Sequence, residues 1–65
     1  MTLEEAHKWI IEQDIGVWHL QNEGWEIITG KGRVWYMEYG PKDGCWVEHP
    51  DFLEAIRLLQ EKMAA

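Results

Sequence analysis

Several side chains that could carry acid–base or recognition chemistry are predicted to gather on one face of a β-sheet. They are His19, Glu26, Tyr36, Glu38, Trp46 and Glu48. Imidazole, carboxyl and phenol groups act as general acids and bases in enzymes. Catalysis also needs a pocket that excludes water, however, and an open sheet face does not form one. We therefore expect no enzymatic activity and no cofactor.

A partner-binding surface is the better interpretation of these residues. Tyrosine and tryptophan are enriched at the energetic centres of protein interfaces, so Tyr36 and Trp46 are the expected anchors. An exposed apolar patch on so small a protein also favours self-association. The expected partner is therefore another protein or a second copy of the chain. The alternative is a solvated face whose cross-strand pairs only stabilise the sheet.

A metal site is not predicted. The possible ligands are His7, His19, Cys45 and His49. Their spacing lacks the short Cys-x-x-Cys or His-x-x-x-His patterns that dedicated zinc sites use. Cys45 and His19 are also expected on opposite faces of the sheet. We interpret Cys45 as a small core residue and His49 as a residue of the turn before the last helix.

The length and charge of the chain narrow the classes of function further. The chain has 65 residues, expected to form one domain over 1–65, and its 12 acidic and 6 basic residues give a formal net charge of −6. Negative charge is repelled by phosphate backbones, so no direct nucleic-acid partner is expected. No apolar run approaches the ~20 residues of a membrane span. With a single cysteine and no predicted membrane partner, we expect a cytoplasmic protein.

The same charge supports a second hypothesis. An acidic protein can act as an inhibitor by occupying the nucleic-acid-binding site, or another basic site, of a different protein, as small phage-encoded proteins do. Such binding would weaken steeply with salt. A small enzyme or a metal-binding domain is the third alternative.

The elements that must position these residues begin and end with a helix. Thr2 and Glu5 form a capping-box pattern, and Gly16 is the expected end of the first helix. Asp51 and Glu54 form the same pattern before the second helix. The apolar stripe of that helix consists of Phe52, Ile56, Leu59 and Met63.

Four β-prone segments lie between the two helices. They are Val17–Leu20, Trp25–Thr29, Arg33–Tyr39 and Cys45–Glu48. The glycine-containing connections between them have the lengths of hairpin loops. We therefore predict an α+β fold in the order α-β-β-β-β-α, with an antiparallel four-stranded meander and both helices packed on one face.

The loop lengths also predict which residues face the helices. Trp18 would pair with Ile27, and Met37 would lie between Trp25 and Val47. Because side chains alternate along a strand, two separate sets follow. The core face would carry Trp18, Leu20, Trp25, Ile27, Trp35, Met37, Tyr39, Cys45 and Val47. The opposite face would carry Val17, His19, Glu26, Ile28, Val34, Tyr36, Glu38, Trp46 and Glu48.

Overall fold

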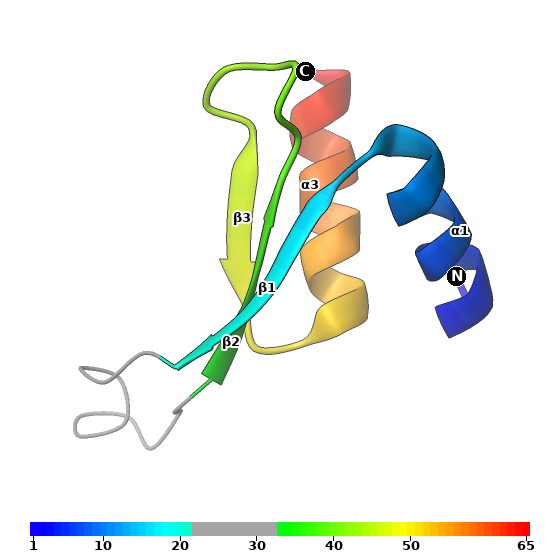
Figure 1. Ribbon diagram of the computed structural model, residues 1–65, viewed down its shortest axis with the longest axis vertical. Coiled ribbons are helices and arrows are strands. Elements are labelled where there is room, and N and C mark those ends of the chain that lie inside the picture. The colour runs from blue at the N-terminus through cyan, green and yellow to red at the C-terminus, as the bar shows by residue number, and fades with distance from the viewer. Residues whose placement is uncertain (22–32) are drawn as a thin grey trace.

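A computed structural model describes residues 1–21 and 33–65 of the chain (Figure 1). Its elements, in chain order, are α1 (Leu3–Gln13), β1 (Gly16–Gln21), β2 (Arg33–Glu38), β3 (Trp46–His49) and α3 (Phe52–Ala64). In these two stretches the strands form one antiparallel sheet in the order β1-β2-β3. The predicted α+β class is therefore confirmed.

The predicted four-stranded meander is not confirmed. Its second strand, Trp25–Thr29, lies outside the described residues. The predicted place of that strand, between the first and third, is wrong because β1 pairs directly with β2. Trp18 lies opposite Tyr36 rather than opposite Ile27. The assumption that each strand pairs with the next β-prone run along the chain fails here.

The hairpin between β2 and β3 follows the prediction. Met37 pairs with Val47, and Tyr36 pairs with Glu48. The backbone N–H of Tyr39 donates to the carbonyl of Cys45 at 2.9 Å, which closes the pairing next to the turn. A short turn leaves little freedom in register, so its length alone predicts the partners correctly.

The first helix begins as predicted, but its C-terminal cap lies two residues before the predicted end. The backbone N–H of Thr2 donates to the Glu5 carboxylate at 2.8 Å, and the N–H of Glu5 donates to the Thr2 hydroxyl at 3.2 Å. Asp14, with φ 54°, caps the other end of α1 in the left-handed conformation. Aspartate tolerates this conformation better than most residues. Gly16, the predicted end, is instead the first residue of β1.

The last helix uses a different cap from the predicted one. The Asp51 carboxylate accepts from the N–H of Glu54 at 2.9 Å, as predicted. The N–H of Asp51, however, donates to Nδ1 of His49 at 2.9 Å rather than to Glu54. The Glu54 carboxylate pairs with Arg57 instead. His49 is the last residue of β3 rather than a residue of the turn, and its imidazole accepts a hydrogen bond from the turn into α3.

The core lies between α3, α1 and one side of the sheet. Its buried residues are Ala6, Ile15, Met37, Cys45, Val47, Ala55, Ile56 and Leu59. The helix α3 packs against β2 and β3, and α1 packs against α3. Trp35 is half-buried against this cluster and meets Phe52 edge to face, with ring centroids 5.0 Å apart. Among the described residues, neither helix is long and apolar enough to cross a membrane.

The side chains of β1 face the sides of the sheet opposite to those predicted. Trp18 and Leu20, predicted to be core residues, are 46% and 41% exposed. Val17, predicted to be on the far side, packs against the core. Direct pairing with β2 puts Val17 opposite Met37, which is fully buried, and so reverses the two sides of the strand.

Candidate functional site

The side of the sheet away from the core cluster carries most of the exposed aromatic surface of the described residues. We call this side the outer face. Cross-strand partners share a side of a sheet, so the two registers determine its members. They are Gly16, Trp18 and Leu20 of β1, Val34, Tyr36 and Glu38 of β2, and Trp46 and Glu48 of β3.

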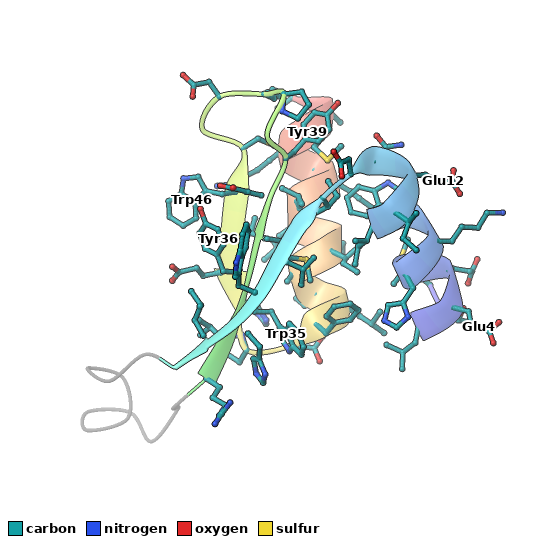
Figure 2. All side chains as sticks on the ribbon, in the orientation of Figure 1. Glu4, Glu12, Trp35, Tyr36, Tyr39 and Trp46 are labelled. Atoms are coloured by element: carbon teal, nitrogen blue, oxygen red, sulfur yellow. The ribbon has the colours of Figure 1, made fainter. Side chains whose placement is uncertain are left out.

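Three aromatic rings contact one another at the middle of the outer face. We call Trp18, Tyr36 and Trp46 the aromatic cluster. The centroid of the Tyr36 ring lies 5.6 Å from that of Trp18 and 5.7 Å from that of Trp46. Figure 2 shows Tyr36 and Trp46 together at the left of the sheet, with both helices to the right. Trp46 is 45% exposed, so the contacts within the cluster leave a large part of its surface open to solvent.

Gly16 positions the first ring of this cluster. The indole of Trp18 folds back over Gly16, and a Cβ at residue 16 would lie 2.7 Å from two of its ring carbons. Residues i and i+2 of a strand lie on the same side, so the absence of a side chain at Gly16 opens the space that the indole occupies. A glycine two residues before an aromatic residue was a signal in the sequence that could have indicated this arrangement.

Two carboxylates lie beside the rings. The Tyr36 hydroxyl donates to the Glu38 carboxylate at 3.1 Å. Glu48 lies directly opposite Tyr36 on β3, and Glu38 lies opposite Trp46. Partial burial, the hydrogen bond to Glu38 and the negative charges of Glu38 and Glu48 together raise the pKa of Tyr36 above 10.0. The phenol is therefore protonated at neutral pH and acts as a hydrogen-bond donor.

A lysine of α3 contacts the far end of the aromatic cluster. Nζ of Lys62 donates to the backbone carbonyl of Trp46 at 2.8 Å and lies 5.3 Å from the centroid of its ring. The carbonyl of Cys45 accepts from the N–H of Tyr39, the residue that follows β2. Successive carbonyls point to opposite edges of a strand, so the carbonyl of Trp46 points away from β2. Lys62 thus covers this edge and places a cation against the Trp46 ring.

The outer face contains an open depression beside Tyr36. We call it the outer groove. Its volume is about 400 Å³, and it is lined by Trp18, Leu20, Tyr36, Glu38 and Glu48. A second depression of about 500 Å³ lies on the other side of β3, next to α3. It is lined by Trp46, Val47, Glu48, Leu58, Glu61, Lys62 and Ala65.

The structure brings together four of the six predicted site residues. Tyr36, Glu38, Trp46 and Glu48 share the outer face. His19 does not, because its ring stacks on Trp35 on the opposite side, with centroids 4.1 Å apart and planes 5° from parallel. The sixth predicted residue, Glu26, lies outside the described residues. Sequence reasoning missed Trp18 and Leu20, which it assigned to the core.

The candidate metal ligands are dispersed. Cys45 is buried in the core, the imidazole of His49 accepts from the turn before α3, and His7 packs edge to face on Phe52. Within residues 1–21 and 33–65, no three His, Cys, Asp or Glu side chains are grouped in a way that could hold a metal ion. The described site is therefore one of aromatic rings and carboxylates.

Comparisons with protein-family models, with curated proteins and with solved structures find no match for this chain.

Proposed function

We propose that this protein is a protein-interaction module that binds a positively charged protein through its outer face and has no catalytic activity of its own. The observation that supports the proposal is the aromatic cluster on the solvent side of the sheet. Trp18, Leu20 and Trp46 are each more than 40% exposed. Tryptophan and tyrosine provide large contact areas and dominate the binding energy of many interfaces.

The charge of the outer face favours a basic partner over a second copy of the chain. Glu38 and Glu48 flank Tyr36, and the whole chain has a net charge of −6. A two-fold dimer through this face would place two negatively charged surfaces against each other, and like charges at an interface cost binding energy. A partner with lysine or arginine side chains would gain from the same carboxylates.

The acidic residues of the helices give the inhibitor hypothesis little support. Glu54 and Glu61 both pair with Arg57 on the surface of α3, and Glu5 is engaged in the cap of α1. These acids are therefore partly neutralised or already hydrogen-bonded. A partner that binds nucleic acid remains within the class of basic partners, but we propose the outer face, rather than the helices, as the surface that binds it.

The state of the single cysteine bears on the cellular location of the protein. Cys45 is a free thiol and is buried in the core. A free thiol is typical of reducing compartments, and we therefore propose that the protein is cytoplasmic.

A displayed library of random peptides tests the proposed function directly. Peptides selected on the wild-type chain are expected to be enriched in arginine and lysine relative to the starting library. Their affinities are then measured by fluorescence anisotropy for the wild type, for Trp46→Glu and for Ile11→Glu. Ile11 is a matched control because it is 78% exposed and lies on α1.

The proposal predicts that Trp46→Glu weakens binding at least about tenfold, the loss expected when an interface anchor is removed, while Ile11→Glu changes it less than about twofold. Circular dichroism checks that both variants are folded. Selected peptides that lack basic residues, or that bind both variants equally, would overturn the proposal. So would light scattering that detects a dimer which Trp46→Glu dissociates, because the face would then be occupied by a second copy.

A further inference from the structure

We propose that the outer groove is a guanidinium-binding site that receives one arginine side chain of the partner. The inference rests on the proposed function and adds the chemical identity of the group that is bound. It is based on three features of the groove, namely its aromatic walls, the placement of its two carboxylates, and the cation that already contacts the neighbouring ring.

The walls of the groove suit a flat cation. Trp18 and Tyr36 line it with ring surface, and the two ring planes are inclined at 60° to each other. A guanidinium is planar and weakly hydrated, so it stacks on one aromatic ring while it presents its edge to hydrogen-bond acceptors. Leu20 adds an apolar surface for the methylene part of the side chain.

Two carboxylates of the groove can accept hydrogen bonds from the edge of a stacked guanidinium. Glu48 lies directly opposite Tyr36 on the neighbouring strand. Glu38 is therefore diagonal to Glu48 across the β2–β3 pair. Diagonal positions in an antiparallel sheet are roughly 7–8 Å apart. Two carboxylates at this spacing can both reach the N–H groups of a single guanidinium, which has five donors in a fixed plane. An ammonium group is a compact point charge and matches this arrangement less well.

The chain itself places a cation on the neighbouring ring. Lys62 lies 5.3 Å from the centroid of the Trp46 ring, whereas none of the described residues that line the outer groove is basic. The described side chains that line the groove therefore carry only negative charge, from Glu38 and Glu48.

Nuclear magnetic resonance titrations with three blocked tripeptides test this inference. The peptides carry arginine, lysine or citrulline between two glycines, and citrulline has nearly the shape of arginine without its charge. The arginine peptide is expected to shift the indole N–H of Trp18 and the amides of Tyr36 and Glu48. We expect the citrulline peptide to bind about tenfold more weakly, the loss typical of removing a charge-assisted hydrogen bond, and the lysine peptide to fall between them.

Two double variants separate a local site from the general effect of charge. Glu38→Gln with Glu48→Gln should reduce arginine binding to the level of the citrulline peptide. Glu4→Gln with Glu12→Gln removes the same charge from α1, where both residues are exposed, and should leave arginine binding within about twofold (Figure 2). Circular dichroism is used to check that both variants are folded.

Each possible result has a definite meaning. Equal binding of arginine and citrulline, equal losses in the two double variants, or shifts outside the groove would overturn the guanidinium site. The proposed function would survive such a result if library peptides still required Trp46. If the library peptides also bound independently of Trp46, both proposals would fail.

Discussion

Replacement of Gly16 by alanine should alter the outer face while leaving the stability of the fold almost unchanged. The added Cβ would lie 2.7 Å from two ring carbons of Trp18, whereas non-bonded carbons settle at about 3.5–4.0 Å. The indole must therefore withdraw by about 1 Å or rotate away. The obstruction comes from the far end of a flexible side chain, so the backbone of β1 can stay in place.

The expected size of the stability change follows from two opposing effects. Loss of the contact between Trp18 and Tyr36 removes an aromatic pair that is worth about 0.5–1.5 kcal/mol. Alanine in place of glycine returns about 0.5–1 kcal/mol, because the unfolded chain has less conformational freedom. The free energy of unfolding should therefore change by less than about 1 kcal/mol.

The assay combines urea unfolding with nuclear Overhauser contacts between the rings of Trp18 and Tyr36. Gly16→Ala should weaken or abolish these contacts and lower the affinity for peptides that bind the outer face. Gly40→Ala is the matched control, because a Cβ at Gly40 would have no atom within 4 Å. Retention of the ring contacts in Gly16→Ala, or a loss of more than about 2 kcal/mol of stability, would show that movement of the indole alone does not relieve the clash.

Three further predictions concern the stability of the fold. Met37→Ala removes a fully buried side chain at the centre of the core and should cost about 2–5 kcal/mol in urea unfolding, enough to unfold much of so small a domain. Lys42→Met removes an ammonium group that donates to three carbonyls at the end of α3 and should cost about 0.5–1 kcal/mol, whereas Lys8→Met, on the exposed surface of α1, should be close to neutral. The hydrogen bonds from Thr2 hold the pKa of Glu5 below 4.5, so its contribution to stability is present above pH 4.5 and is lost as the pH falls through the lower, folded-state value. A melting series from pH 6 to pH 2 should show a smaller decline for Glu5→Gln than for the wild type, and identical declines would contradict the assignment.

The parts of the fold that depend on local signals were predictable from the sequence. Thr2 and Asp51 cap the two helices because their side chains can reach backbone N–H groups three residues ahead. The turn between β2 and β3 is short, so loop length determined the pairing of Tyr36 with Glu48. The same register placed Trp46 and Glu38 correctly on the outer face.

The first strand could not be placed from its own pattern. Both sides of β1 carry apolar residues, Val17 on one and Trp18 with Leu20 on the other, so alternation does not distinguish the side that faces the core. Pairing with β2 decides between them, because it sets Val17 beside the buried Met37. The two paired strands are separated in the sequence by residues 22–32. A separation of this length does not determine which residues of the two strands pair.

The most direct test of the proposed binding face is a chemical-shift map of the wild-type chain titrated with the tightest library peptide. We expect the largest changes on Trp18, Tyr36, Trp46 and Glu48, and we expect them to weaken as salt is added because the carboxylates take part. Changes concentrated on α1, or on the side of the sheet that carries His19 and Trp35, would contradict it.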